Sequence, residues 1–137
     1  MTSETFQIGE VASRTGLSLR TVRYYDAVGL VAPSGRTEGG FRLYTEPDIQ
    51  RLLLIRALKP AELSLEDLQE ILGLDVQLRS SDPDSAGRAE AEADLGRMID
   101  LAAQRVRVQR ERLVAAELAL EVLRRSMSPE PANATIR

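Results

Sequence analysis

Two residue types that carry much of protein chemistry are missing from this sequence of 137 residues, which has no cysteine and no histidine. Their absence excludes disulfides, a cysteine nucleophile, and thiolate or imidazole ligands for a metal. It also removes the most frequent general base. The sequence has no phosphate-binding glycine loop and no catalytic triad either. We therefore predict that the chain is not an enzyme and holds neither a metal nor a cofactor.

Aromatic residues and long apolar runs are scarce. Aromatics make up 4% of the sequence, so a core must be built from leucine, valine, isoleucine and alanine. No stretch approaches the roughly 18 apolar residues of a membrane span. The first residues do not form a signal peptide, because a basic start followed by an apolar run is missing. We expect a cytoplasmic protein without a membrane partner.

The net charge of −3 is unevenly distributed along the chain. Residues 1–60 carry eight basic and six acidic side chains, a net of +2, whereas residues 61–137 carry ten and fifteen, a net of −5. A mildly basic first part with an acidic second part is compatible with DNA binding through one face.

Residues 8–31 contain the start and stop signals of two short helices. Apolar residues in 8–15 share one helical face, and Gly16 is the predicted stop. Ser18 is the predicted N-cap of a second helix over 19–27, with Gly29 as its stop. This spacing is that of a helix-turn-helix, although any pair of helices joined by a short turn would look alike.

A small β-hairpin, or wing, is predicted next. Pro33 and Gly35 break helix, Gly39-Gly40 can supply positive φ angles, and residues 41–44 alternate as in a strand. Thr45 and Ser64 are then N-caps of two further helices, the second of which should end at Gly73. Residues 75–87 read as a polar linker.

Residues 88–127 form one long helical pattern with a heptad repeat. The two positions of each heptad that would face a partner helix are called the seam here. Nine of the ten seam positions between Leu95 and Met127 are apolar, and Gln109 is the exception. The alternative is a single helix packed on residues 6–74 of its own chain. A helix of this length would extend roughly 60 Å, past any domain this small. We expect a homodimer, with a flexible tail at 128–137. The predicted dimerisation residues are Leu95, Ile99, Ala102, Val106, Leu113, Ala116, Leu120 and Leu123.

Four motifs over residues 6–74 resemble the MerR family of bacterial transcription regulators: FQIGEVA at 6–12, TGLSLRTVRYYD at 15–26, GLV at 29–31 and RTEGGFRLY at 36–44. The resemblance implies a mainly α fold, with a winged helix-turn-helix DNA-binding domain at 6–74 and a long antiparallel coiled-coil helix behind it. It also implies a nucleoid-associated dimer that binds near-palindromic promoter DNA. Such a dimer bends and untwists the DNA, and so acts on RNA polymerase through the shared promoter.

The sequence departs from the family in three places. Residues 59–64 read KPAELS, where the family usually has Leu-Gly-Phe-Ser. We expect no large effector domain behind the long helix, and therefore do not expect the drug-binding subfamilies. The cysteines of the mercury-, copper-, zinc- and redox-sensing members are missing, which excludes those signals.

Most of the predicted DNA contacts lie on the second helix and the wing. Arg20, Arg23 and Tyr24 fall at i, i+3 and i+4, so they share one helical face. Guanidinium groups read base edges or hold phosphates, and hydroxyls hold phosphates. The full predicted set is Ser18, Arg20, Thr21, Arg23, Tyr24, Tyr25, Arg36, Gly40, Phe41, Arg42 and Lys59.

Alternatives remain open for several of these residues. Arg20 and Arg23 could lie on a solvated helix face, or Arg23 could pair with Asp26. Tyr25 could lie in the core, Phe41 could pack rather than lean on sugar–phosphate, and Lys59 could simply be solvated. At the level of function, the main hypothesis is a regulator that responds to a small-molecule effector or to stress. The alternatives are an effector-free repressor or DNA-architectural protein, and an adaptor that binds another protein through the long helix.

Overall fold

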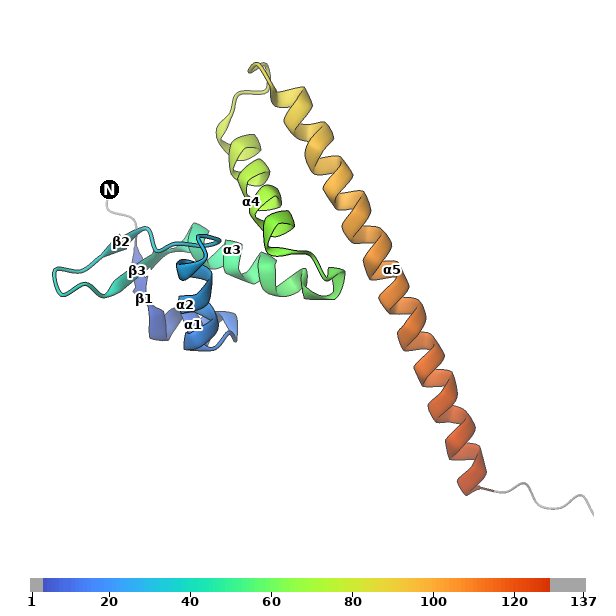
Figure 1. Cartoon of the computed structure of the whole chain (residues 1–137). Helices are drawn as coiled ribbons and strands as arrows, with labels where there is room; N and C mark the ends of the chain where they lie inside the picture. Colours follow the sequence, from blue (N-terminus) through green and yellow to red (C-terminus); the bar gives the residue numbers. More distant parts are fainter. Residues whose placement is uncertain (1–3, 129–137) are drawn as a thin grey trace, which may run out of the picture.

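The computed structural model describes residues 4–128, in which a head of short elements is followed by one long helix (Figure 1). The expected mainly α fold with a small wing is confirmed. Residues 129–137, which make up most of the predicted tail, lie outside the described residues. The elements are β1 (Thr5–Gln7), α1 (Ile8–Thr15), α2 (Leu19–Ala27), β2 (Gly35–Arg36), β3 (Arg42–Thr45), α3 (Glu46–Ala57), the 3₁₀ turn η1 (Lys59–Ala61), α4 (Leu65–Ser80) and α5 (Arg88–Met127).

The helix-turn-helix forms as the start and stop signals predict. Gly16 ends α1 with φ +72°, a left-handed conformation that a residue with a Cβ adopts poorly. Ser18 caps α2, because its Oγ accepts a hydrogen bond from the Thr21 N–H at 3.0 Å. Both ends of the turn are therefore fixed by local chemistry.

The wing is confirmed as an antiparallel β2–β3 hairpin, and Gly40 takes the positive φ of its turn, +82°. A third strand, β1, pairs with the other edge of β3, so that Phe6 lies opposite Tyr44. The sequence did not predict β1, because three residues are too few to show alternation.

One apolar core holds α2 against the rest of the head. It draws residues from α1, α2, α3, α4, β3 and the loop after α2, so α2 is packed from several sides. Burial of each large apolar side chain contributes about 1.5–3 kcal/mol. The core residues are Val11, Val22, Leu30, Val31, Tyr44, Ile49, Leu52, Ile55 and Leu72.

Asp48 is a buried carboxylate at the start of α3, with a side chain 1% exposed. It accepts hydrogen bonds from the Thr45 N–H at 2.9 Å and the Ser34 hydroxyl at 2.5 Å, and it pairs with Arg51 at 2.5 Å. Burial acts to raise its pKa, but the hydrogen bonds from Ser34, Thr45 and Arg51 outweigh burial and hold the pKa below its ordinary value.

Asp48→Asn is expected to lower the free energy of unfolding at pH 7 by about 1–3 kcal/mol, because the charge-assisted bonds are lost. A carboxyl with a lowered folded pKa stabilises the fold above its unfolded pKa, and this contribution disappears as the pH falls through the folded pKa. The difference between wild type and variant should therefore shrink below about pH 4. Urea unfolding at a series of pH values measures it. An unchanged difference down to pH 2.5 would contradict the assignment.

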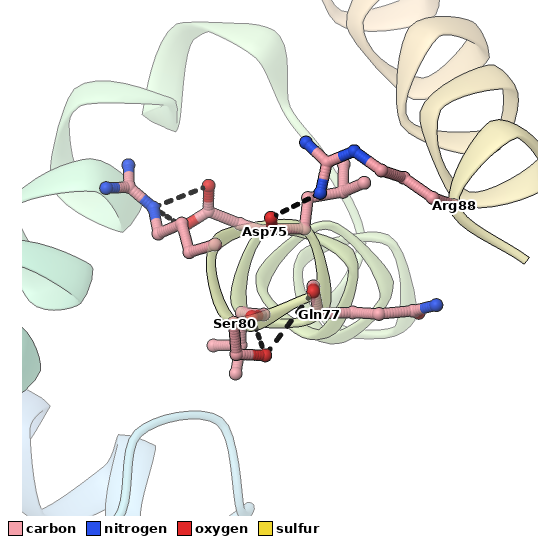
Figure 2. A network of polar contacts seen from close by, with 7 residues as sticks. Asp75, Gln77, Ser80 and Arg88 are labelled. Atoms are coloured by element: carbon pink, nitrogen blue, oxygen red, sulfur yellow. Dashed lines mark hydrogen bonds and ion pairs between the residues drawn. The ribbon is translucent and has the colours of Figure 1, made fainter. Parts of the chain in front are cut away.

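The prediction that Gly73 ends the fourth helix is wrong, since α4 continues to Ser80 and residues 75–80 of the predicted linker are helical. One interior glycine costs a helix only about 1 kcal/mol. A hydrogen bond from α5 and an ion pair within α4 support the far end of the helix. Arg88, on the first turn of α5, donates to the Leu78 carbonyl at 2.9 Å, and Asp75 pairs with Arg79 at 2.9 Å (Figure 2). These contacts satisfy and stabilise the last turn of α4.

Helix α5 begins and ends where the heptad pattern predicts, and its two halves have different surroundings. The first half packs against α4 and η1, with Ala91 and Ala102 buried. All residues from Glu111 to Ser128 are exposed. Ala102, predicted at the seam between subunits, is 8% exposed against its own head. None of the helices within residues 4–128 is long and apolar enough to cross a membrane.

Candidate nucleic-acid interface

Helix α2 presents a polar face to solvent. Arg20, Arg23 and Tyr24 are exposed, the last at 53%. Within residues 4–128, neither arginine forms an ion pair, so the alternative that Arg23 pairs with Asp26 is not found. Their guanidinium groups are therefore free to meet base edges or phosphates.

Three other predicted residues, two in α2 and one at its N-cap, have structural partners. Tyr25 is half-buried against the core, as its alternative expected, with its ring 5.8 Å from that of Tyr24. The Ser18 Oγ caps the helix and lies 2.8 Å from the Thr21 Oγ1. Ser18 and Thr21 thus shape the N-terminus of α2, where backbone N–H groups favour an anion.

The wing is tied to α2 by a single carboxylate. Arg42 donates through Nε to Asp26 Oδ2 at 2.7 Å, and Arg36 approaches the same oxygen at 3.4 Å. Arg36 also donates to the Gly40 carbonyl at 3.3 Å. The hydrogen bond to Asp26 raises the pKa of the Arg42 guanidinium above its ordinary value, so Arg42 stays charged.

The two wing arginines therefore connect the wing to α2, and they also carry positive charge. The Arg42 side chain is 29% exposed and lies between the wing and α2, whereas Arg36 is more open to solvent. Phe41, at the tip, is 66% exposed and is free to lie on a sugar–phosphate backbone. Asp26 is a functional candidate that sequence reasoning did not assign, because a pair 16 residues apart leaves no periodic signal.

A second basic corner borders the opposite end of α2. Lys59 and Arg56 line a cavity of about 640 Å³ together with Gly16, Ser18 and Thr21. A Cβ added to Gly16 would lie 3.2 Å from the Arg56 guanidinium, so this arginine lies directly over the turn. The sequence did not predict Arg56 as a DNA contact either, because its spacing does not distinguish it from any other charged residue on the surface of α3. The structure thus places Lys59 beside the helix N-terminus.

The predicted DNA contacts lie along α2 and near its two ends. Its N-terminus borders Lys59, its middle exposes Arg20, Arg23 and Tyr24, and its C-terminal Asp26 holds the wing. No cluster of acidic residues suited to a metal occurs within residues 4–128. In this arrangement, groups with the chemistry to bind phosphate flank groups with the chemistry to read bases.

A separate apolar groove lies between the head and α5. Its volume is about 580 Å³, and the side chains of Asp75, Arg107 and Arg110 also border it. Four of the predicted dimerisation residues line it, together with leucines and an isoleucine of the head. The apolar residues used below are Leu54, Leu58, Ile71, Leu95, Ile99 and Val106.

Comparison with known proteins identifies relatives of the head and of the whole chain. Residues 6–74 match the model of the MerR HTH family regulatory protein. The HTH-type transcriptional regulator ZntR of Escherichia coli is 44% identical over 69 residues, which cover 50% of this chain and 49% of ZntR. The matches therefore span about half the length of such curated relatives.

Solved structures match over more of the chain. PbrR691 from Ralstonia metallidurans CH34, solved in complex with lead(II), is 31% identical with a TM-score of 0.56, covering 88% of this chain and 87% of that one. HiNmlR, a MerR family regulator lacking the sensor domain and solved bound to promoter DNA, has a TM-score of 0.68. It covers 96% of this chain and 100% of its own, and at 23% identity the likeness concerns the fold.

Proposed function

The chain belongs to the MerR family of helix-turn-helix regulatory proteins, and from this premise we propose that it is a transcription regulator. In this proposal a homodimer binds a near-palindromic promoter and distorts the DNA to control transcription initiation. The observation that carries the proposal is the surface around α2, where Arg20, Arg23 and Tyr24 are exposed between two basic flanks. The relatives are regulators rather than enzymes.

The recognition helix supplies the sequence-reading part of this surface. An α-helix fits the major groove of B-DNA, where an arginine can bind guanine bidentately. The wing and Lys59 lie at opposite ends of α2, so they would meet phosphates on either side of the groove. The proposed DNA contacts are Ser18, Arg20, Thr21, Arg23, Tyr24, Tyr25, Arg36, Gly40, Phe41, Arg42 and Lys59.

The dimer is proposed from the exposed half of α5. Leu113, Leu120 and Leu123 are 64%, 51% and 63% exposed, a large apolar surface for a helix without a partner. In an antiparallel pair, this half of one helix meets the first half of the other, where Leu95, Ile99 and Val106 border the groove. Each chain then covers the other's groove, and the interface repeats itself by two-fold symmetry.

A second apolar row supports the same assembly. Val114, Leu118 and Val122 are exposed outside the seam positions, at i, i+4 and i+8. The exposed half of α5 is thus apolar on more than one side. One row can face the partner's α5 while the other meets the partner's head near Leu54, which is also exposed. The groove favours a second copy of this chain over the adaptor alternative. A helix that binds an unrelated protein would not need a matching apolar groove on its own head.

DNA distortion follows from the geometry of such a dimer in this proposal. Two recognition helices held by one rigid coiled coil can fit two half-sites by bending or untwisting the DNA between them. This deformation costs a few kcal/mol, which many phosphate contacts offset. The change realigns the promoter elements for RNA polymerase, so the protein would act in the cytoplasm, at the nucleoid. A small-molecule effector stays a prediction, with an effector-free repressor as its alternative.

A gel-shift experiment with DNA from upstream of the protein's own gene tests the proposal. The expected result is a discrete shifted band at nanomolar protein in moderate salt, which resists competition by shuffled DNA of the same composition. Binding that shuffled DNA removes equally well would reject a sequence-specific regulator and favour the architectural alternative. No binding at all would favour the adaptor.

Arg42→Ala is expected to weaken binding to all DNA sequences alike, by about three- to tenfold, and to lower the salt dependence. The wing would lose its anchor, and Asp26 would keep an unneutralised charge near the phosphates. Titration of operator and shuffled DNA over a range of salt measures both effects. Arg97→Ala, at an exposed position of α5 outside the seam, is the matched control. A loss confined to operator DNA would contradict this role.

A further inference from the structure

The turn between α3 and α4 has an unusual conformation. Glu62, which directly follows η1, has φ +50° and ψ +44°, and it is the one non-glycine residue with positive φ within residues 4–128. A left-handed glutamate is uncommon, because its Cβ crowds the following carbonyl. The surrounding structure must therefore hold this residue in place.

Two side chains of α5 hold Glu62 from outside. Arg105 Nη1 donates to the Glu62 backbone carbonyl at 3.0 Å, and Gln109 Nε2 donates to Glu62 Oε1 at 2.8 Å. Gln109 is the one polar residue among the ten seam positions of the heptad. Its bond to the head gives a physical reason for that exception, because a leucine at this position could not hold the turn.

The same turn continues directly to the DNA side of the head. The Glu62 N–H donates to the Lys59 carbonyl at 3.0 Å, which closes η1, and Ala61 between them is fully buried. Lys59 and Glu62 border one cavity with Gly16, Ser18 and Thr21, the residues at the N-terminus of the recognition helix. A chain of short contacts thus runs from α5 through Glu62 to Lys59.

We propose that Arg105 and Gln109 are positioning residues of the DNA interface. They fix the turn at Glu62 so that Lys59 is held beside the N-terminus of α2, where a phosphate would bind. This inference rests on the proposed function, and it adds that the helix assigned to dimerisation also orders a phosphate contact. Residues 59–64, where the sequence departs from the family, include Glu62. In this proposal the departure therefore links the turn to α5, because the Glu62 side chain accepts the hydrogen bond from Gln109.

The test compares operator affinity and its salt dependence among four variants of the full chain. Lys59→Ala should lower affinity about three- to tenfold and reduce the salt slope by about two, one phosphate for each subunit. Gln109→Ala should produce most of the same loss, because Lys59 is no longer held. Glu62→Gln keeps an oxygen acceptor for Gln109 and should bind as wild type does. Arg97→Ala, at an exposed position of the same helix that does not border Glu62, is the matched control.

The double variant Lys59→Ala with Gln109→Ala separates positioning from a general loss of structure. It should bind like Lys59→Ala alone, since two residues that act through one contact are not additive. Sedimentation and circular dichroism should show every variant dimeric and folded. Wild-type affinity and salt slope in Gln109→Ala, additive losses in the double variant, or wild-type binding by Lys59→Ala would each overturn the inference. The proposed function itself fails only if the wild-type protein shows no preference for operator DNA.

Discussion

Leu113→Asp is expected to convert the dimer into monomers and to reduce operator affinity by more than about 100-fold. The side chain lies at a seam position in the exposed half of α5. A two-fold interface would place an unpaired carboxylate in an apolar seam twice, and each costs several kcal/mol. Since each factor of ten in affinity is about 1.4 kcal/mol, even 3 kcal/mol removes more than two decades.

Sedimentation velocity at micromolar protein measures the first effect, and operator titration measures the second. Gln104→Asp introduces the same charge at an exposed position outside the seam, so this control should remain dimeric. A wild-type protein that sediments as a stable monomer would reject the dimer altogether. A Leu113→Asp variant that stays dimeric would move the interface away from this seam.

Arg23→Ala is expected to have the second largest effect, a loss of about 1–3 kcal/mol for each half-site if the side chain reads a base. Arg23 is exposed on the middle of α2 and forms no ion pair within residues 4–128, so its guanidinium has no competing partner to leave. The variant should also tolerate changes at one base pair of each half-site that wild type discriminates against.

Affinities for the operator and for a set of single-base-pair variants measure this relaxed specificity. Arg79→Ala is the matched control, because Arg79 lies on α4 and pairs with Asp75 away from α2. An equal loss on every sequence would reassign Arg23 to a phosphate. Wild-type affinity and specificity would remove it from the interface.

Local signals in the sequence predicted most of the fold. The cap residues Ser18 and Ser64 start their helices where predicted, and Gly40 turns the wing. These features depend on interactions within a few residues, so their pattern can be read directly from the sequence. The heptad likewise predicted both ends of α5, because a long periodic pattern without proline leaves little choice.

The parts that the sequence did not predict depend on contacts between distant segments. Strand β1 exists because β3 offers it an edge. Helix α4 passes Gly73 because Arg88, on another helix, satisfies its last carbonyls. Asp26 pairs with Arg42 rather than with Arg23, a choice that sequence spacing cannot decide. The positive φ of Glu62 is likewise supported by a contact from a distant segment, the hydrogen bond from Gln109 on α5.

Protection of guanine N7 from methylation on operator DNA tests the central claim most directly, because N7 lies in the major groove that α2 is proposed to enter. The account predicts two protected clusters, related by two-fold symmetry and centred a whole number of helical turns apart. Arg23→Ala should weaken protection in both clusters together. Uniform protection along the duplex, or a single cluster without a symmetric partner, would contradict a dimer that reads two half-sites.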